Sequence, residues 1–254
     1  MRCDFHVHSR HSFDCALELD TIVKRAKKAG LDAVLIANHN TVVPPEELER
    51  CQGQGVVLLP GAEYSTDVGH VLAIFGDRPL EDLGLRLKGK VYDHREVIEA
   101  VHQMGGAAVL AHPFAHGRTP APEALARFDG LELCNSRAGY VRKGEANPMA
   151  ARALLPSQLA TAGSDAHLAC EIGRSYVELD CPPPYTRERV LAALRGGGTL
   201  HSKPTAPWTM AVSQVYKAFR LKQYGIIPKN LVKFCYGLAC RLFPRLFGVR
   251  PYRR

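Results

Sequence analysis

The 254-residue chain has no CxxC pair and no apolar run of the roughly 18 residues that a membrane-spanning helix needs. Its eight cysteines are scattered, which excludes a zinc ribbon and favours reduced thiols. The opening MRCDFHVHS contains no apolar segment typical of a secretory signal. We therefore expect a cytoplasmic protein.

Acidic residues are absent from 205–254, which hold ten Lys or Arg, whereas the other 204 residues hold 23 basic and 25 acidic ones. The net charge of +8 thus belongs to a C-terminal appendage, and we divide the chain into 1–203 and 204–254. Two amphipathic helices are expected there, at 209–224 and 231–243, since apolar side chains recur at helical spacing up to Leu246. Such a segment is compatible with docking on the body, peripheral contact with an anionic membrane or, as the weakest alternative, nucleic-acid binding.

The body alternates between apolar runs typical of strands and amphipathic stretches typical of helices. The strands are expected at 3–9, 32–37, 56–59, 70–75, 107–111, 131–134, 159–162 and 175–179. The helices are expected at 19–29, 93–104, 122–128, 146–155 and 187–195. This order predicts an α/β fold with a parallel sheet, either closed as a barrel or doubly wound.

Histidines and carboxylates follow the predicted strands. His6 and His8 are two residues apart, so they point to the same side of the first strand. The other candidate metal ligands share this location at or near strand ends: Asp14, His39, Glu63, His70, His112, Asp165 and His167. Because strand ends form the functional edge of parallel α/β folds, we expect one site. Six imidazoles with three carboxylates suit two or three divalent ions of Mn, Zn or Fe.

The motifs DFHVHS, NHNT, GAE, AHP and GSDAH make residues 1–200 resemble the PHP (polymerase and histidinol phosphatase) family. The resemblance implies a distorted (β/α)7 TIM-like barrel with its metal site at the C-terminal strand ends. It implies that the nine residues named above are the metal ligands. The chain departs from the usual family pattern at Asn38, where Asp is common. A neutral amide can orient a neighbour but cannot act as a base, so Asn38 could alter metal choice or lower activity.

The resemblance implies a metal-dependent phosphoesterase in which Glu63 is shared by two ions and a metal-bridging hydroxide attacks phosphorus. The predicted catalytic residues are Glu63, Asp165 and Arg174, with Arg174 as phosphate clamp and Arg118 and Arg137 as alternatives. The expected substrate is a nucleotide or oligonucleotide phosphate. Histidinol phosphate and phosphotyrosyl protein are alternatives within this class. From another class, the chain could be a catalytically weak metal-binding module localised by its basic tail, or hold metal only for structure.

Overall fold

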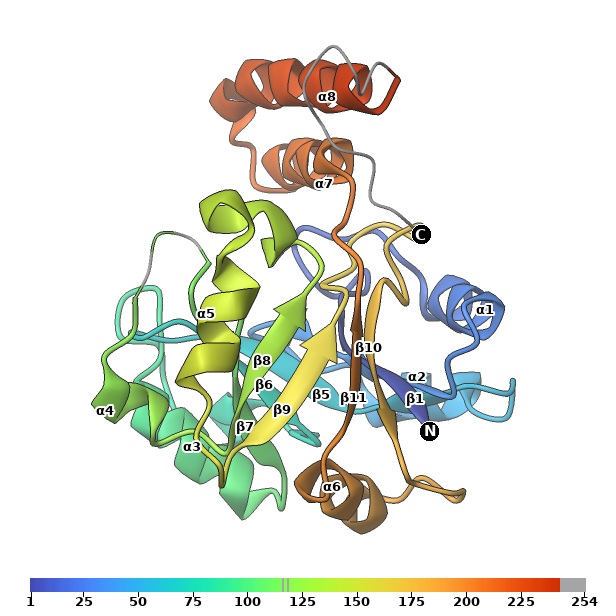
Figure 1. Ribbon diagram of the computed structural model, residues 1–254, viewed down its shortest axis with the longest axis vertical. Coiled ribbons are helices and arrows are strands. Elements are labelled where there is room, and N and C mark those ends of the chain that lie inside the picture. Colours follow the sequence, from blue (N-terminus) through green and yellow to red (C-terminus); the bar gives the residue numbers. More distant parts are fainter. Residues whose placement is uncertain (116, 118, 243–254) are drawn as a thin grey trace.

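Two β-sheets form the centre of the structure, a computed structural model that describes residues 1–115, 117 and 119–242 (Figure 1). One sheet has the strand order β11-β10-β1-β2-β4, and the other β3-β5-β6-β7-β8-β9. The strands are β1 (Arg2–Val7), β2 (Ala33–Ile36), β3 (Asn38–His39), β4 (Val57–Leu59), β5 (Gly61–Ser65), β6 (His70–Ile74), β7 (Ala107–Ala111), β8 (Gly130–Asn135), β9 (Leu159–Gly163), β10 (Ser175–Leu179) and β11 (Gly198–Ser202).

The two sheets enclose a shared apolar core. Phe5 and Leu35 of the first sheet pack with Leu72 and Val109 of the second. The structure therefore confirms a mixed α/β fold. Among the described residues, the strands are hydrogen-bonded into two separate sheets rather than one closed barrel. The closed (β/α)7 barrel therefore stays a prediction.

The expectation of a wholly parallel sheet is wrong. β6 runs antiparallel to both β5 and β7, and β10 runs antiparallel to β1 and β11. Only residues 66–69 connect β5 to β6, and a parallel crossover needs about a dozen residues or more. Sequence reasoning did not predict β5, and without it this short hairpin connection could not be recognised.

Helices cover the outer faces of the sheets (Figure 1). They are α1 (Leu19–Lys28), α2 (Pro45–Cys51), α3 (His94–Gln103), α4 (Pro122–Leu125), α5 (Ala146–Ala153) and α6 (Arg187–Arg195), with 3-10 turns η1 (Leu80–Leu83) and η2 (Ala138–Gly144). The helices predicted at 19–29 and 93–104 are confirmed within a residue or two at each end. α3 begins after Asp93, whose carboxylate accepts a hydrogen bond from the backbone N–H of Arg95 and caps the helix.

The last described elements are α7 (Pro207–Arg220), η3 (Tyr224–Ile226) and α8 (Ile227–Leu242), which lie beyond the sheets at the top of Figure 1. The two predicted C-terminal helices are present with shifted ends. α8 already begins at Ile227 because a proline in the first helical turn, here Pro228, loses no helical hydrogen bond. α8 packs closely on the start of α7, since a Cβ at Gly237 would lie 2.8 Å from the backbone nitrogen of Trp208. The predicted helical positions Phe243 and Leu246 lie outside the described residues.

Candidate metal centre

All nine side chains predicted as metal ligands gather at one edge of the two sheets. Most follow the carboxyl end of a strand, as expected. His70 is instead the first residue of β6, and it reaches the same edge because this strand runs in the opposite direction. Glu63 lies within β5 rather than in a loop. Sequence reasoning thus identified side chains that converge and placed His70 correctly at the start of a strand, but it missed the direction of that strand and the strand that carries Glu63.

Glu63 lies at the middle of the cluster. Its Oε1 is 2.8 Å from Nδ1 of His70 and 3.0 Å from Nε2 of His112. Its Oε2 is 2.8 Å from Nδ1 of His39. The side chain is 1% exposed, so each of its oxygens faces a different set of imidazoles inside the protein.

A second group forms around the end of β1. Nε2 of His6 and Nε2 of His8 are 3.2 Å apart. Oδ1 of Asp165 lies 3.2 Å from Nε2 of His8, and Oε2 of Glu63 lies 3.5 Å from the same atom. Ligand atoms of His6, His8 and Glu63 therefore all lie within 4.8 Å of one another, and Asp165 contacts this group through His8.

Asp14 organises a third group. Its Oδ2 lies 3.2 Å from Nε2 of His39 and 3.2 Å from Nε2 of His167. His8 lies close enough for these four residues to offer ligand atoms all within 4.8 Å of one another. The nine residues thus form three overlapping groups of nitrogen and oxygen donors, the chemistry that transition metals of the zinc and manganese type accept.

Two buried atoms at the centre fit a bound ion better than a hydrogen bond. Oε2 of Glu63 and Nδ1 of His39 are 2.8 Å apart, yet their orientation does not allow a hydrogen bond, and neither has another hydrogen-bond partner among the described residues. Buried polar atoms are normally hydrogen-bonded or coordinate a metal. These residues therefore fit a metal ion, which would use both lone pairs.

The carboxylates of the group are ionised, whereas its histidines differ from one another. Nearby acids outweigh burial and raise the pKa of His6, His39 and His112, so these rings must release protons when an ion binds. Burial lowers the pKa of His8 to about 3, so its imidazole is neutral and can donate a lone pair. Burial would raise the pKa of Glu63, but the adjacent His70 and His39 outweigh it and hold this pKa well below its usual value. In Asp14, hydrogen bonds from two histidines likewise overcome burial and lower the pKa. The carboxylates thus remain anionic.

Glu132 of β8 orients the cluster and was missed by sequence reasoning. Its Oε1 lies 3.0 Å from Nδ1 of His6, and its Oε2 accepts the backbone N–H of His112 at 2.8 Å. Asn135 donates from Nδ2 to the same Oε2 at 3.0 Å. A carboxylate behind a ligand histidine fixes the ring and increases its basicity. One signal was available, because Glu132 is a charged residue inside an apolar strand.

Asn38 has a clear structural task. Its Oδ1 accepts hydrogen bonds from the backbone N–H and the hydroxyl of Ser9, at 2.7 and 3.1 Å. These bonds hold the turn that follows His8, and a carboxylate oxygen would accept them equally well. The departure from the usual family residue therefore leaves the three donor groups complete.

The backbone is constrained where it presents these side chains. Asp165 and His112 have positive φ values of 55° and 30°, which non-glycine residues rarely adopt. Gly163 allows β9 to approach β1, since a Cβ there would lie 2.2 Å from Cβ of His6 and 2.8 Å from Oε1 of Glu132. The surrounding fold thus stabilises backbone conformations at Asp165 and His112 that are unfavourable for these residues in isolation.

The structure does not bring Arg174 into the cavity at the metal centre. Its guanidinium donates to the backbone carbonyls of Cys170 and Pro204. Arg118 lies outside the described residues. Arg137 does line the cavity, together with Lys217 of α7, a residue that sequence reasoning assigned only to the appendage. The cations beside the metal centre are therefore Arg137 and Lys217. Arg174, which was chosen because it follows His167 closely in the sequence, is not one of them.

A buried polar network fixes α7 over this edge. Oε2 of Glu171 accepts from Arg137 at 2.8 Å and from the backbone N–H of His167 at 2.9 Å. Its Oε1 accepts from the hydroxyls of Thr205 and Thr209, at 2.8 and 2.7 Å. Glu171 thereby links α7 directly to the loop that carries His167.

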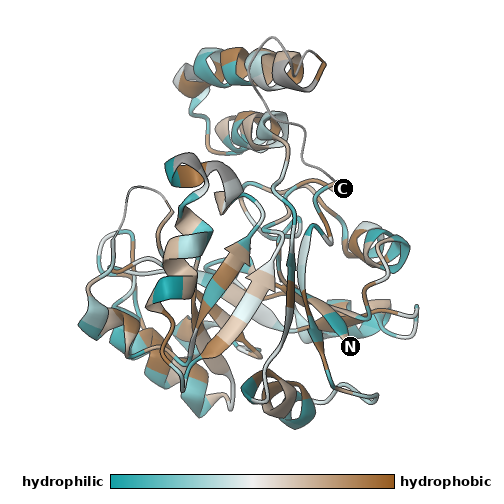
Figure 2. Ribbon diagram, viewed as in Figure 1, coloured by the Kyte–Doolittle hydropathy of each residue, from teal (hydrophilic) through white to brown (hydrophobic). Residues whose placement is uncertain are grey.

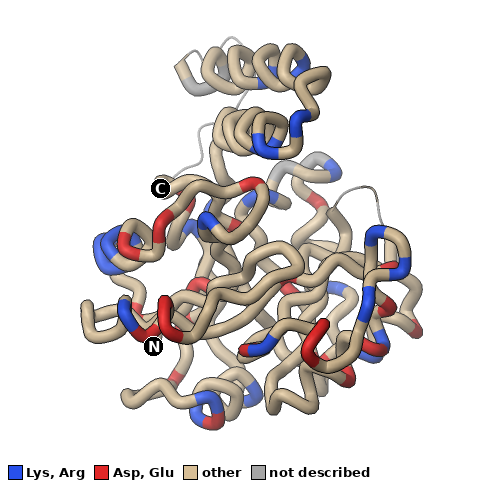
Figure 3. The backbone as a smooth tube through the Cα atoms, turned by 180° about the vertical axis from the view of Figure 1, so that it is seen from behind, with Lys and Arg blue, Asp and Glu red and all other residues tan. Residues whose placement is uncertain are grey.

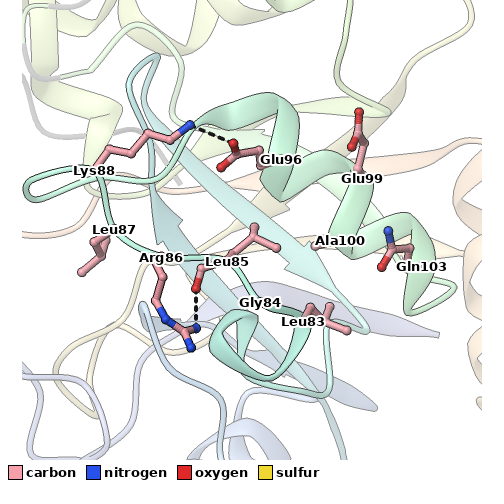
Figure 4. A pocket seen from close by; sticks show the side chains of 10 residues that line it. All are labelled: Leu83, Gly84, Leu85, Arg86, Leu87, Lys88, Glu96, Glu99, Ala100 and Gln103. Carbon is pink, nitrogen blue, oxygen red and sulfur yellow. Dashed lines mark hydrogen bonds and ion pairs between the residues drawn. The ribbon is translucent and has the colours of Figure 1, made fainter.

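Two neighbouring cavities that share lining residues lie at the metal centre. The first, of about 140 Å³, is lined by donor residues and by Met210, Gln214 and Lys217 of α7. The second, of about 240 Å³, continues past His70, His112 and Lys217. A separate cavity of about 370 Å³ lies between residues 83–88 and α3 and shares no lining residue with them (Figure 4). There Lys88 is already paired with Glu96 at 2.8 Å, so this cavity offers no comparable site.

Comparison with known proteins agrees with this geometry. The PHP domain family matches residues 4–159, and the PHP-associated family matches residues 144–199. An uncharacterized protein of Methanocaldococcus jannaschii is 29% identical over 167 residues, covering 59% of this chain and 89% of that protein.

Two solved structures share the fold. PsfC from Pseudomonas syringae has a TM-score of 0.59 at 21% identity and covers 85% of this chain and 97% of its own. A two-domain protein from Bacteroides vulgatus, described as containing a predicted PHP-like metal-dependent phosphoesterase, has a TM-score of 0.59 at 19% identity, over 80% of this chain and 64% of its own. With the family matching more than half of its residues, the chain belongs to the PHP domain family.

Proposed function

We propose that this chain hydrolyses phosphoesters with two or three divalent ions, of the Mn, Zn or Fe type, held by the nine convergent side chains. The observation that carries the proposal is the position of Glu63, whose two oxygens face different donor groups at distances of 2.8–3.0 Å. When bound, such ions lower the pKa of a coordinated water and offset the negative charge that builds on a phosphoryl group. Family membership supports the same reaction class.

The protein's own residues would keep the site ready for this chemistry. Glu63 and Asp165 remain ionised because neighbouring histidines lower both pKa values, so each can hold a cation. Glu132 fixes the ring of His6. These interactions exist before substrate arrives, so the donor set needs little rearrangement during the reaction.

Lys217 is the side chain that we assign to substrate binding, in place of Arg174. It lines both cavities at the metal centre, and its Nζ lies 4.7 Å from the centre of the Phe13 ring. Arg137, the other cation at the first cavity, is already paired with Glu171. An ammonium group on a flexible stem is well suited to a phosphate oxygen.

The cavity sizes favour a substrate that extends beyond its phosphate. The first cavity, of about 140 Å³, is smaller than the usual ligand pocket of about 300–1,000 Å³, so it suits a phosphoryl group more than a whole nucleotide. The second cavity provides room for the attached alcohol. We therefore propose a nucleotide or oligonucleotide phosphate, with histidinol phosphate and phosphotyrosyl protein as the alternatives.

The test is metal-dependent release of nitrophenol from matched mono- and diester substrates by the wild type and Asp165→Asn. We expect turnover with Mn²⁺ that collapses in the variant, and the mono-to-diester ratio then assigns the subclass. Equal release by both proteins would contradict the proposal and favour a metal-binding module. Circular dichroism of both proteins controls for folding.

A further inference from the structure

Large apolar side chains are exposed mainly at the C-terminal end of the described chain. Of eleven such exposed residues, only Leu87 and Leu155 lie in the body. The other nine lie within residues 219–242, at the end of α7, on η3 and on α8, and we call this surface the C-terminal apolar face: Phe219, Leu221, Tyr224, Ile226, Leu231, Val232, Tyr236, Leu238 and Leu242. Exposed apolar groups scattered singly are normal, whereas a contiguous set marks an interaction surface.

α8 has two distinct sides. Phe234 and Gly237 face α7, where they approach Trp208. Leu231, Leu238 and Leu242 recur at helical spacing on another side and are 51%, 37% and 61% exposed. The hydropathy colouring of α7 and α8 shows apolar residues on these helices beyond the body (Figure 2). The apolar stripe of α8 therefore does not serve to dock the helix on the rest of the structure.

The surroundings of this face carry charge of one sign. Lys222, Lys229 and Lys233 are exposed among its apolar residues, and residues 205–254 contain no acidic residue. Figure 3 shows the contrast with the body, where both signs are interspersed. Basic side chains beside an exposed apolar face are complementary to a surface that is both anionic and apolar.

We propose that the C-terminal apolar face binds the surface of an anionic lipid membrane, with α8 lying in the plane of the interface. α8 has 16 residues, fewer than the roughly 20 that span a bilayer, and no described helix is long and apolar enough to cross one. A second copy of this chain is a poorer occupant, because it would bring two basic surfaces together. Nucleic acid would satisfy the lysines but leave the apolar side chains in water.

This arrangement gives the metal centre a defined orientation. Met210, Gln214 and Lys217 of α7 line the cavity at the metal centre, while α8 packs on α7 away from the sheets (Figure 1). The network around Glu171 holds α7 to the body. A membrane-bound α8 would therefore keep the metal centre on the membrane-proximal side of the protein.

The experiment is flotation of the full chain with vesicles of phosphatidylcholine alone or mixed with phosphatidylserine. We expect recovery with the anionic vesicles, decreasing as salt is raised. Lys229→Gln with Lys233→Gln should weaken binding about fivefold for each lysine, whereas Lys24→Gln with Lys28→Gln, at the same spacing on α1, should leave it unchanged.

A second pair of variants separates the apolar contribution. Val232→Ser with Leu242→Ser should weaken vesicle binding by at least about tenfold, and the matched Leu87→Ser with Leu155→Ser should not. Because all four side chains are exposed, thermal unfolding should be similar in both pairs. The assay does not depend on hydrolytic activity, so its outcome is independent of the proposed function.

Three results would overturn the proposal. One is no recovery of the wild type with anionic vesicles. Another is a dimer by light scattering that Val232→Ser with Leu242→Ser dissociates, without vesicle binding. The third is oligonucleotide binding that the lysine variants abolish and the apolar variants leave intact, again without vesicle binding.

Discussion

The metal centre and the C-terminal helices both depart from the usual pattern of apolar side chains inside and polar side chains outside. The metal centre buries polar and charged side chains, whereas the C-terminal helices expose apolar ones. At the metal centre, histidines and carboxylates such as His6, His8 and Glu63 are at most 1% exposed. On α8, side chains such as Val232 and Leu242 are more than 60% exposed. Buried charge and exposed apolar surface both cost free energy in isolation, so each region is suited to binding a partner. The first suits cations, and the second suits a lipid surface.

Glu171 connects the two regions. It accepts hydrogen bonds from the backbone of the His167 loop and from Thr205 and Thr209 at the start of the C-terminal segment. A division of the chain at residue 203 therefore separates two compositions but cuts through a buried polar network. Substitutions in the metal centre, in this network and on α8 test how independent the two regions are.

Glu63→Gln should have the largest effect. The amide cannot supply two anionic oxygens, and loss of several kcal/mol of charge stabilisation lowers kcat by about a thousandfold or more. The measurement is steady-state hydrolysis of a nitrophenyl phosphodiester with saturating Mn²⁺. Glu47→Gln, at a carboxylate paired with Arg10 and His11, serves as the control and should retain activity. Comparable turnover in the two variants would show that Glu63 is not required for hydrolysis.

Glu171→Ala should destabilise both regions together. It leaves the guanidinium of Arg137 buried without its partner, a change that typically costs about 3–5 kcal/mol. Urea unfolding measures the free energy directly. Glu145→Ala removes an exposed pair with Arg152 and should cost no more than about 1 kcal/mol. If both variants unfold alike, the buried network does not link α7 to the body.

Glu132→Gln should affect metal binding more than folding. Removing a carboxylate behind a ligand histidine typically costs about 10–100-fold in metal affinity. Titration with Mn²⁺ should show this loss, and excess metal should restore part of the activity. The control is Asp129→Asn, whose partner His102 is exposed and which belongs to none of the donor groups. An unchanged metal affinity would mean that Glu132 only supports the fold.

Lys217→Ala should reduce kcat/KM by about tenfold or somewhat more, the usual value for a charge-assisted hydrogen bond to phosphate. Metal content should stay constant, because Lys217 is not a donor to the ions. Lys222→Ala, in the same segment but outside both cavities, is the matched control. Equal kinetics for both variants would show that α7 does not contact substrate.

Single apolar substitutions should separate the two regions most simply. Leu110→Ala in β7 removes a fully buried side chain and should cost about 2–5 kcal/mol of unfolding free energy. Leu231→Ala on α8 removes a side chain that is 51% exposed and should change it by less than about 0.5 kcal/mol. A large effect of Leu231→Ala would mean that this side of α8 packs within the protein.

The sequence contained more information about the metal centre than about its surroundings. The nine donor residues stand in short motifs whose spacing is visible in one sequence, and the structure brings them together. The orientation of β6 was missed because β5 was not predicted, so the four-residue connection from Ser65 to His70 could not be recognised as too short for a parallel crossover. Glu132 was missed because a single carboxylate in a strand carries no motif.

The cations show where local sequence reasoning ends. Arg174 was chosen because it follows His167 closely, but the chain turns away after Cys170 and its guanidinium binds backbone carbonyls. Lys217 is fifty residues from His167 in the sequence and reaches the cavity only because α7 folds back over the metal centre. Contacts of this kind depend on tertiary packing. They cannot be predicted from residue spacing within a single helix or strand.

If Glu63 joins two groups of metal donors, its removal should change the number of ions that the protein retains. Wild type and Glu63→Gln would be loaded with Mn²⁺, desalted and analysed for metal per chain by mass spectrometry. We expect the wild type to retain two or three ions and the variant to lose at least one of them. Retention of one ion or none by the wild type, or the same number in both proteins, would contradict this role of Glu63.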